Sequence, residues 1–394
     1  MRICIIGSGA TGLILSILLK QQNKDNDVFV IEKNAKIAKK LYATGNGKCN
    51  IGNSSDITKG IYYNDDKVLS ILNNFTFEKQ IKYFKSIGLY TKMNNELCYP
   101  YSESAKSFID TLIDFAKQNG VHFILETQFV DYKINNNIVN VKCIPEIKNN
   151  TFDKLVITSG GCSSPVLGSD GSVFEILKKH GYQITNLIPG LAPIYTKENT
   201  KSVSGNRVKA NVSLLVNGNK VYSEKGEVLF KDKGLSGIVI MNISSFIARR
   251  FINTNNEKYI LSLDLLSDIS YNDFEEIIKF NKLNNRNILS GIFNDQLSLY
   301  FDKMLSLSKS LDVINIYEKL KNVCFNFDGF YPFKDSQVTV GGVKNECFDL
   351  KTLSSRHEPN IYFGGEVLNF DGLCGGFNLM YCFACAKTIA NDLK

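Results

Sequence analysis

Residues 2–13 read Arg-Ile-Cys-Ile-Ile-Gly-Ser-Gly-Ala-Thr-Gly-Leu, and this stretch decides the fold. Residues 2–6 form an apolar, β-branched run that is long enough for one buried parallel strand. Gly7, Gly9 and Gly12 then form a G-x-G-x-x-G motif. In such a motif the first glycine makes a tight turn, the second lets the backbone approach a pyrophosphate, and the third lets the helix pack close to the strand.

The motif is followed in order by the other parts of a dinucleotide-binding unit. Residues 11–19 have helical spacing, and the start of this helix offers free N–H groups and a positive dipole end to phosphates. Residues 28–31 form a second strand, and Glu32 follows it, twenty residues after Gly12. An acid at this place accepts hydrogen bonds from ribose hydroxyls. The alternative, a strand–turn–helix whose glycines serve only the turn, leaves Glu32 without a role.

The other end of the chain carries a second glycine-rich turn. Residues 361–379 read Ile-Tyr-Phe-Gly-Gly-Glu-Val-Leu-Asn-Phe-Asp-Gly-Leu-Cys-Gly-Gly-Phe-Asn-Leu. A short strand, residues 361–363, leads into the glycines, and Gly375-Gly376 precede a helix expected over residues 378–393. An ordinary strand-to-helix turn is the alternative. Because the N-terminal motif is also present, we predict that the two ends form the two halves of one flavin site.

Between these ends lies a run that is typical of one flavoprotein family. Residues 39–51, Lys-Lys-Leu-Tyr-Ala-Thr-Gly-Asn-Gly-Lys-Cys-Asn-Ile, resemble the K-L-x-x-T-G-N-G-[KR]-C-N segment of the BaiN/aminoacetone-oxidase-like flavoproteins, also called YhiN-like. Further pieces match in order over essentially the whole chain: Tyr99-Pro100 with Ser104-Ala105-Lys106, residues 158–161, residues 227–230 with 234–237, and residues 338–343. The sequence departs from the family pattern at Ile238, Cys374 and Met380 and in a shorter 165–171 loop, which bears on the substrate more than on FAD.

The resemblance implies that FAD is the cofactor and suggests where it binds. Asp371 is expected near the ribityl or pyrophosphate part of FAD. The start of the last helix is expected to face the N1–C2=O edge of the flavin, where its dipole stabilises negative charge on the reduced ring. The predicted cofactor-binding residues are Gly7, Gly9, Ala10, Thr11, Gly12, Glu32, Lys33, Lys40, Thr44, Gly45, Asn46, Lys48, Cys49, Asn50, Val130, Ser159, Gly160, Gly161, Gly365, Glu366, Asp371, Gly375, Gly376, Phe377, Asn378 and Leu379.

We expect an α/β fold, namely a Rossmann-like FAD-binding domain with an inserted β-barrel plus helical domain. The FAD-binding domain comprises residues 1–188 and 337–394. The inserted substrate or cap domain, residues 189–336, begins where alternating apolar and polar runs appear after Pro189. Helices are predicted within the insert at residues 239–251, 271–282, 288–294, 297–307 and 312–323.

The composition is that of a soluble globular protein, with 44% hydrophobic and 22% charged residues in a chain of 394. The net charge of +7 comes from scattered lysines, so no nucleic-acid surface is predicted. The first strand follows Met1 directly and no apolar run approaches about 18 residues, so we expect a cytoplasmic protein without a membrane span. The ten cysteines are then reduced, and the C-x-x-C pair Cys382 and Cys385 is expected to be two buried thiols. No metal site is predicted.

The chemistry is expected to come from the flavin, because the local sequence contains no Ser-His-Asp or Cys-His set. No catalytic residue is therefore assigned. We expect an FAD-dependent oxidoreductase that acts on a small organic substrate in a cleft between the FAD-binding domain and the insert. The resemblance implies either reduction of an activated C=C bond or oxidation of an amine. For Cys49 and Cys374, a redox role stands beside packing or cofactor contact.

The electron donor and the alternatives to this function stay open at this point. No second G-x-G-x-x-G unit is visible, so a dedicated NAD(P)H domain is not expected, although nicotinamide could approach the flavin directly. A tRNA-modifying flavoprotein would carry a basic RNA-binding extension, and the sequence shows none. A flavin-binding redox sensor or scaffold without turnover is the non-enzymatic alternative. The sequence specifies no oligomeric state.

Overall fold

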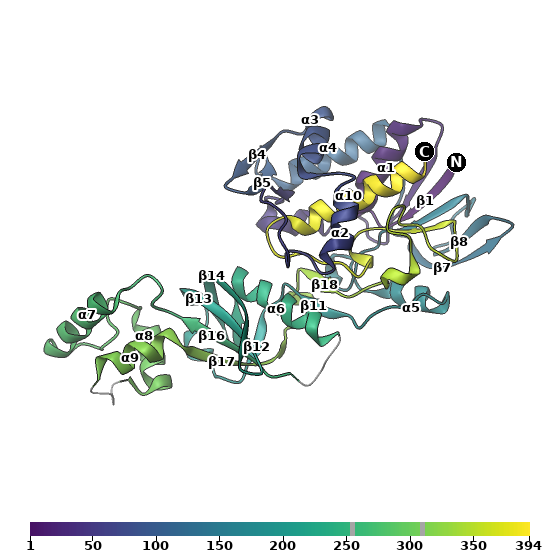
Figure 1. Cartoon of the computed structure of the whole chain (residues 1–394). Coiled ribbons are helices and arrows are strands. Elements are labelled where there is room, and N and C mark those ends of the chain that lie inside the picture. Colours follow the sequence, from purple (N-terminus) through teal and green to yellow (C-terminus); the bar gives the residue numbers. More distant parts are fainter. Residues whose placement is uncertain (253–256, 308–311) are drawn as a thin grey trace. The chain divides into compact units, whose positions relative to one another are not determined.

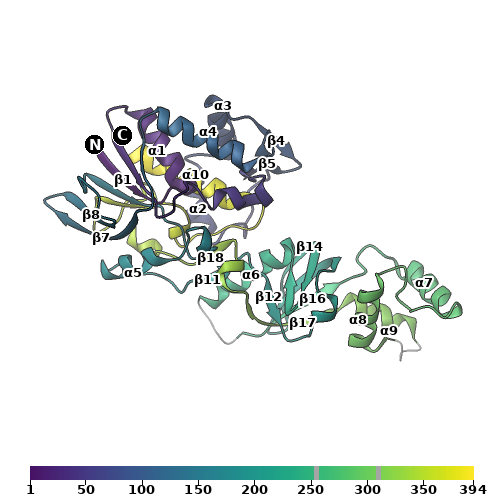
Figure 2. The ribbon, with the colours of Figure 1, turned by 180° about the vertical axis from the view of Figure 1, so that it is seen from behind.

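The computed structural model describes residues 1–252, 257–307 and 312–394. The chain divides into two compact units (Figure 1). One combines Met1–Ile188 with Gln337–Lys394, and the other is Pro189–Ser336. The chain leaves the first unit through β11 (Ile188–Gly190) and returns through β18 (Val338–Val340). Both ends of the chain therefore belong to the first unit, where they lie near each other in Figures 1 and 2.

The first unit is built on a five-stranded parallel sheet in the order β19-β10-β1-β2-β6. The strands are β1 (Arg2–Ile6), β2 (Asp27–Ile31), β6 (His122–Ile124), β10 (Lys154–Ile157) and β19 (Ile361–Phe363). β1 lies at the centre with residues 3–6 buried, as its apolar run predicts. On β10, Leu155 pairs with Cys4 on one side and with Ile361 on the other. Segments from the beginning, middle and end of the chain thus become neighbours.

Two long helices, α1 (Ala10–Gln22) and α10 (Phe377–Asp392), lie side by side in this unit (Figures 1 and 2). Residues 11–19 of α1 are all buried, which is typical of a central helix rather than an amphipathic surface helix. The remaining helices are α2 (Asp65–Leu72), α3 (Phe77–Ser86), α4 (Ala105–Gln118) and α5 (Ser172–Lys179), with 3-10 turns η1 (Leu41–Gly47), η2 (Pro165–Leu167), η6 (Asn345–Cys347) and η7 (Gly365–Val367). The sequence predicts helices over residues 75–87 and 104–119, where α3 and α4 lie, but none at α2 or α5.

The first unit also contains two small antiparallel sheets, and β18 pairs with β11. β3 (Gly52–Asn53), β5 (Leu97–Pro100) and β4 (Thr91–Asn94) form one, and β7 (Gln128–Asn135), β8 (Ile138–Ile144) and β9 (Thr151–Phe152) form the other. The register of β7 with β8 shifts between Phe129 and Asp131. Val130 is therefore a bulge residue without a Cα partner in β8.

The second unit contains a closed barrel with the strand order β12-β15-β14-β13-β16-β17. These strands are β12 (Ile194–Thr196), β13 (Arg207–Val216), β14 (Asn219–Lys231), β15 (Gly234–Ser236), β16 (Tyr259–Asp264) and β17 (Val323–Phe330). Alternate residues such as Val212, Leu214 and Leu261 fill its core. The other elements are α6 (Ile238–Phe251), α7 (Tyr271–Leu283), α8 (Asp295–Leu305) and α9 (Val313–Lys321), with the turns η3 (Lys201–Val203) and η5 (Phe333–Asp335). The Rossmann-type sheet and this barrel with helices confirm the predicted fold class.

The helix predicted over residues 288–294 is wrong. The structure has turns and one isolated bridge, between Ser290 and Phe293, and Gly291 adopts a left-handed φ of +85°. The Asn281 side-chain amide donates to the carbonyl oxygens of Ile288 at 3.1 Å and of Ser290 at 2.9 Å. Since a side chain satisfies these carbonyls, the segment forms no helical hydrogen-bond ladder, although its apolar residues have helix-like spacing.

Candidate cofactor site

The glycine turn after β1 has no room for a side chain at its first or third glycine. Gly7 has a φ of +97°, and a Cβ there would lie 2.7 Å from the Thr158 carbonyl oxygen. A Cβ at Gly12 would lie 2.0 Å from the Gly7 carbonyl oxygen. Thr158, which follows β10, donates its hydroxyl to the Gly7 carbonyl oxygen at 2.9 Å. Strand β10 therefore fixes the turn, and both glycines are required for close packing.

The second glycine of the motif faces open space. Gly9 is the N-cap of α1 and no side-chain hydrogen bond caps this helix. A Cβ on Gly9 would meet no atom of the described residues within 4 Å. The N–H groups of the first turn, which includes Ala10 and Thr11, point out of the helix at its positive dipole end. An anion such as a pyrophosphate fits this opening, so these residues fit the phosphates of FAD.

Glu32 is buried, and groups of the chain already hydrogen-bond its carboxylate. Its Oε2 accepts from the Ser8 backbone N–H at 3.0 Å and from the Ser8 hydroxyl at 2.7 Å. Its Oε1 accepts from the Asn34 backbone N–H at 2.9 Å and from the Asn34 side-chain amide at 2.7 Å. A carboxylate has about four acceptor positions, so a ribose hydroxyl would share or replace one of these donors. Ser8, which the sequence analysis does not single out, is thus a supporting residue of the site.

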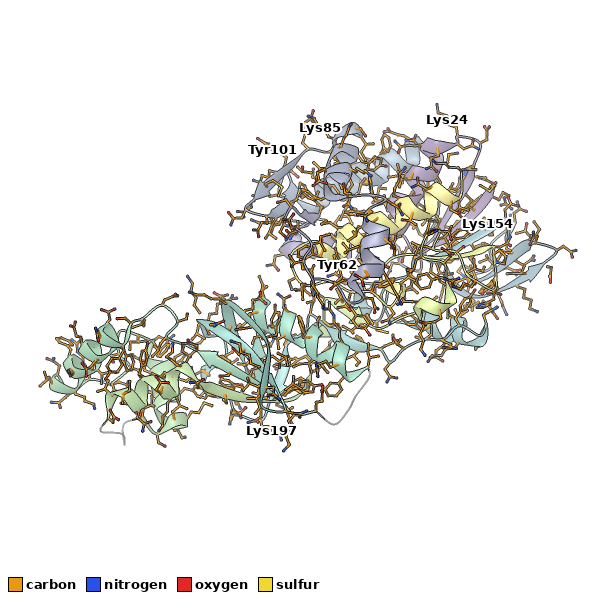
Figure 3. The ribbon with its side chains drawn as sticks, viewed as in Figure 1. Lys24, Tyr62, Lys85, Tyr101, Lys154 and Lys197 are labelled. Atoms are coloured by element: carbon orange, nitrogen blue, oxygen red, sulfur yellow. The ribbon has the colours of Figure 1, made fainter. Side chains whose placement is uncertain are left out.

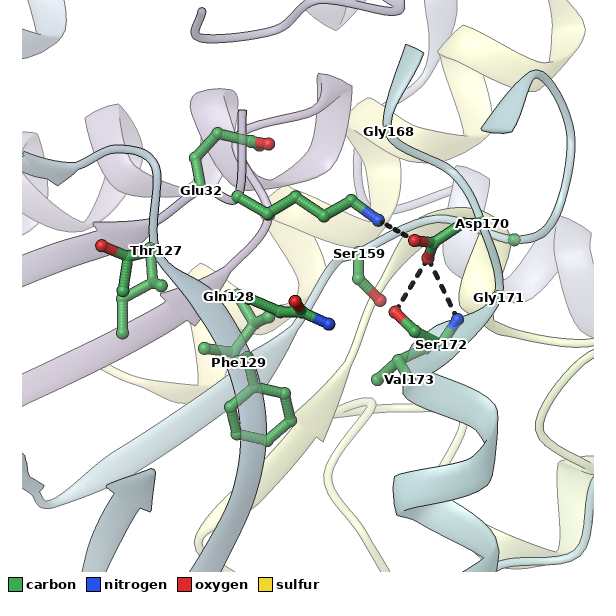
Figure 4. Close-up of a pocket in the computed structure, with 15 residues that line it drawn as sticks. Glu32, Thr127, Gln128, Phe129, Ser159, Gly168, Asp170, Gly171, Ser172 and Val173 are labelled. Carbon is green, nitrogen blue, oxygen red and sulfur yellow. Dashed lines mark hydrogen bonds and ion pairs between the residues drawn. The ribbon is translucent and has the colours of Figure 1, made fainter. Parts of the chain in front are cut away.

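A pocket opens beside Glu32 at the ends of β1, β2 and β10 (Figure 4). It is lined by Ile6, Gly7, Ile31, Glu32, Lys33, Thr127, Gln128, Phe129, Ser159, Gly161, Gly168, Asp170, Gly171, Ser172 and Val173. The Ser159 hydroxyl is buried and has no hydrogen-bond partner among the described residues, so a ligand with a polar group would satisfy it. Val130 is not among the lining residues, although its neighbour Phe129 is. Gly160 adopts a left-handed φ of +78° between Ser159 and Gly161.

Lys40 and Glu366, two predicted cofactor residues, come together in an ion pair of 3.0 Å. The other oxygen of Glu366 accepts from the Thr339 backbone N–H at 2.9 Å. A Cβ on Gly161 would lie 2.3 Å from the Thr339 hydroxyl, so this glycine is required for the close approach. Thr339 is fully buried on β18 and is absent from the predicted site residues. Its place between two buried valines, Val338 and Val340, is the sequence feature that could have identified Thr339, because a polar residue in such a strand needs a hydrogen-bond partner.

The two ends of the chain meet at Thr11. Gly365 follows β19 in a left-handed conformation, and a Cβ there would lie 2.5 Å from the Thr11 hydroxyl oxygen. A Cβ on the preceding Gly364 would lie 2.9 Å from the Thr11 methyl carbon. The start of α1 and the segment after β19 are therefore in direct contact. This contact joins the two predicted halves of the site across almost the whole length of the sequence.

The 44–50 loop packs onto the start of α10. Gly45, Asn46 and Cys49 all have positive φ, between 52° and 58°, so the loop is tightly wound after Thr44. A Cβ on Gly376 would lie 2.9 Å from the Asn50 side-chain oxygen. Asn46 and Lys48 are exposed, and Lys48 forms an ion pair of 3.2 Å with Glu103. The second half of the loop, at Asn50, therefore contacts one of the predicted flavin-facing glycines.

The turn before α10 is held by its own side chains. Asn378 accepts a hydrogen bond from the Gly372 backbone N–H at 2.9 Å and donates to the Gly372 carbonyl oxygen at 2.8 Å. The preceding residue, Asp371, is almost completely buried. Phe377 packs edge-on against Tyr62, and Leu379 is half-buried on the first turn. Asn378 and Phe377 therefore shape the turn, whose backbone could then hold a cofactor.

Cys49 and Cys385 are buried, whereas Cys382 is only partly buried, so the prediction of two buried thiols holds for Cys385 alone. Burial raises the pKa of Cys49 to about 11, against a partial lowering by a hydrogen bond with Thr44. Burial likewise raises the pKa of Cys382 to about 11 and that of Cys385 to about 12. Cys374 is half-buried just before Gly375. These environments favour packing over thiolate chemistry. Within the described residues there is no cluster of metal-ligating side chains and no helix able to cross a membrane.

The chain is similar to known proteins over nearly its full length. The model of the HI0933-like protein Rossmann domain matches residues 1–392. The 3-dehydro-bile acid delta(4,6)-reductase of Clostridium scindens is 26% identical over 97% of this chain and 96% of its own length. The ribosomal RNA dihydrouridine synthase of Haemophilus influenzae is 24% identical over 98% of each chain. Among solved structures, a 3-ketosteroid delta1-dehydrogenase from Sterolibacterium denitrificans has a TM-score of 0.49 at 12% identity, covering 99% of this chain and 98% of that one.

The family match and the geometry agree on the nature of the first unit. Its parallel sheet, its glycine turn and the opening at the start of α1 are those of a Rossmann-type FAD-binding domain, and the family model names a Rossmann domain over almost all residues. The family resemblance carried by the 39–51 run is confirmed: the chain belongs to the HI0933-like protein family.

Proposed function

We propose that the protein is an FAD-dependent oxidoreductase that reduces a C=C bond conjugated with a carbonyl group. One observation carries this proposal: two relatives, each aligned over almost the whole chain, bear names that describe this bond change on different molecules. One name describes reduction at the delta(4,6) positions of a 3-dehydro-bile acid, and the other describes the formation of dihydrouridine in ribosomal RNA. In both molecules the double bond is conjugated with a carbonyl, so a hydride and a proton can add across it.

The chain itself supplies binding and electrostatics for this reaction. FAD, when bound, supplies the hydride. The backbone N–H groups at the start of α10 form a positive helix end, which favours negative charge nearby. Lys40 adds a partly buried cation that its ion pair with Glu366 holds in place. Both features favour a cofactor or substrate group that gains electrons.

We further propose that the substrate contacts come from residues 189–336, which form a compact unit with its own core. The support is that all the predicted cofactor-binding residues lie outside this segment. Hydrogen exchange with and without a bound 3-oxo-4-ene steroid tests the proposal. Protection confined to the first unit would contradict it.

We propose that NAD(P)H, if it is the electron donor, binds directly at the flavin and not in a separate nicotinamide domain. The support is that G-x-G-x-x-G occurs once in the sequence, at Gly7 to Gly12. Nicotinamide and substrate would then use the same face in turn, which gives parallel initial-rate lines. Intersecting lines together with a trapped ternary complex would indicate a separate nicotinamide site.

The reaction is tested with the purified protein, which should be yellow and should release FAD rather than FMN on heating. The flavin is photoreduced without oxygen and mixed with a 3-oxo-4,6-diene steroid, and the expected result is flavin reoxidation with a product two mass units heavier. Oxidised protein mixed with aminoacetone tests amine oxidation, the competing reaction. If the steroid and uridine-containing RNA both fail to reoxidise the reduced flavin, and aminoacetone fails to reduce the oxidised flavin, a redox sensor or scaffold without turnover is favoured.

A second candidate substrate is a uracil ring in RNA, contrary to the expectation from scattered charge. The hairpin of β4 and β5 favours it, because Lys92 pairs with Tyr99 and the Tyr101 N–H donates to the Tyr90 carbonyl oxygen at 2.8 Å. Side chains alternate between the two faces of a strand, so those of Tyr90, Lys92, Tyr99 and Tyr101 share one face. Tyr90 is 62% exposed and Tyr101, labelled in Figure 3, is 70% exposed. A Cβ on Gly45 would lie 3.8 Å from the Tyr99 ring, so this face adjoins the 44–50 loop.

An open face with aromatic rings and a lysine suits nucleobases, which stack on aromatic side chains for about 1–3 kcal/mol each. The double variant Tyr90→Ala/Tyr101→Ala is therefore expected to bind a uridine-rich single-stranded RNA at least about fivefold more weakly. Leu283→Ala, at an exposed apolar residue of α7, is the control. Equal RNA binding by both variants would count against this candidate, and steroid reduction without RNA reduction would exclude it.

A further inference from the structure

Two segments that are far apart in the sequence join at the rim of the pocket beside Glu32. The Lys33 ammonium lies 2.7 Å from the Asp170 carboxylate, and both residues line the pocket, where Figure 4 labels Asp170. Lys39 donates to the Val166 carbonyl oxygen at 2.8 Å. Two lysines of the segment after β2, Lys33 and Lys39, therefore bind the 165–171 loop.

The 165–171 loop is shaped to come this close. Gly168 has a φ of +114°, and a Cβ there would lie 2.5 Å from the side-chain nitrogen of Asn34. Asn34 is the residue whose backbone and side chain both donate to Glu32. The loop therefore rests on the same short segment that orients the predicted ribose ligand, and a side chain at residue 168 would displace the Asn34 amide that donates to Glu32.

Asp170 also orders the loop's far end. Its second oxygen accepts from the Ser172 backbone N–H at 3.1 Å and from the Ser172 hydroxyl at 2.8 Å, at the start of α5. Burial raises the pKa of Asp170, but the hydrogen bonds from Lys33 and Ser172 outweigh it and leave this pKa below its usual value. Asp170 is therefore a carboxylate at neutral pH, and one side chain links the start of α5 to Lys33.

We propose that the Lys33–Asp170 ion pair is a positioning device that holds the 165–171 loop against the end of β2 and so slows the release of the adenosine half of FAD. The proposal rests on the predicted binding of adenosine at this pocket and adds Asp170 to the residues that retain it. The Lys33 and Asp170 side chains are 28% and 42% exposed, so water and salt reach the pair and its effect is moderate.

The experiment measures the rate at which the FAD-loaded protein releases FAD, at low and at high salt. Lys33→Met and Asp170→Asn are each expected to release FAD about two- to fivefold faster than the parent at low salt, and to lose most of the salt dependence. The charge-swapped double variant Lys33→Asp/Asp170→Lys is expected to recover slow, salt-dependent release. Glu175→Gln, which removes the exposed ion pair with Lys178 on α5, is the matched control and is expected to behave like the parent.

FMN separates this role from a merely structural one, because FMN lacks the adenosine half. The variants are expected to release FMN at the parent rate. An equal acceleration for FMN and FAD would overturn the proposal, as would unchanged FAD release in both single variants or a double variant that stays fast. A parent protein that binds FMN but not FAD would instead refute the adenosine site itself, so the two failures are distinguishable.

Discussion

The helices α1 and α10 begin in the same way in sequence but meet different surroundings. Each starts at a glycine N-cap, Gly9 or Gly376, and neither has a side-chain cap. A Cβ on Gly9 would meet no described atom within 4 Å, whereas a Cβ on Gly376 would lie 2.6 Å from the Gly52 carbonyl oxygen. The glycine of α1 is thus free for a ligand, and the glycine of α10 is required by the fold. A shared motif therefore does not imply a shared physical reason for the glycine.

The largest expected effect follows from Gly376→Ala. Its φ of +96° disfavours alanine by about 1–2 kcal/mol, and the contact with Gly52 adds about 1–3 kcal/mol. The free energy of unfolding of the FAD-free protein should fall by roughly 2–5 kcal/mol in urea denaturation. Gly47→Ala is the control, because Gly47 has a φ of +82° but open space around it. Equal losses in the two variants would show that packing at Gly376 is unimportant and would weaken the comparison.

Glu32→Ala comes next and probes the segment around Gly9. The change removes the acceptor of the Ser8 and Asn34 donors together with any ribose contact. Since hydrogen bonds to a charged group are worth about 1.5–3 kcal/mol, FAD affinity should fall roughly 10- to 150-fold in fluorescence titration. Glu32→Gln should lose less, because its side-chain oxygen still accepts. Unchanged FAD affinity in Glu32→Ala would remove Glu32 from the site.

Gly9→Ala should separate ligand binding from folding. Gly9 has a φ of −67°, which alanine adopts freely, and alanine is a poorer N-cap than glycine, so the free energy of unfolding should fall by no more than about 1 kcal/mol. The new methyl group would occupy the opening in front of α1, and FAD affinity should fall about tenfold. Denaturation and FAD titration of the same preparation give both values. A large loss of stability, or full FAD affinity, would contradict the open character of this helix start.

The smallest effect on the cofactor is expected for Cys382→Ala/Cys385→Ala, inside α10. Flavin content and metal content should equal those of the parent. Because burial raises the folded-state pKa of these thiols to about 11 and about 12, the folded state holds their protons more tightly than the unfolded state. The stability that they contribute is therefore present below about pH 8.5 and declines as pH rises towards those values, and the variant should show a shallower decline. Zinc in the parent that the variant lacks would refute the packing role.

Several elements follow from local sequence, and others do not. The strand–glycine–helix unit and Glu32 fall where predicted, because their spacing along a short segment fixes the geometry. The 288–294 helix is wrong because an amide on Asn281 takes the carbonyls that a helix would use. The spacing of apolar residues indicates which residues are buried. It does not indicate which donors hydrogen-bond to the backbone carbonyl groups.

The sequence by itself determined the Rossmann-type unit and the two glycine-rich ends, because each is specified by residues close together in the chain. Only the tertiary structure decided that Gly365 touches Thr11, that Thr339 hydrogen-bonds Glu366, and that Asp170 reaches Lys33. The physical reason is that the parallel order of β1, β10 and β19 brings distant segments to one sheet edge. The hydrogen-bond and ion-pair partners of these polar side chains are set by the arrangement of the strands in space. The spacing of residues within a short segment does not specify that arrangement.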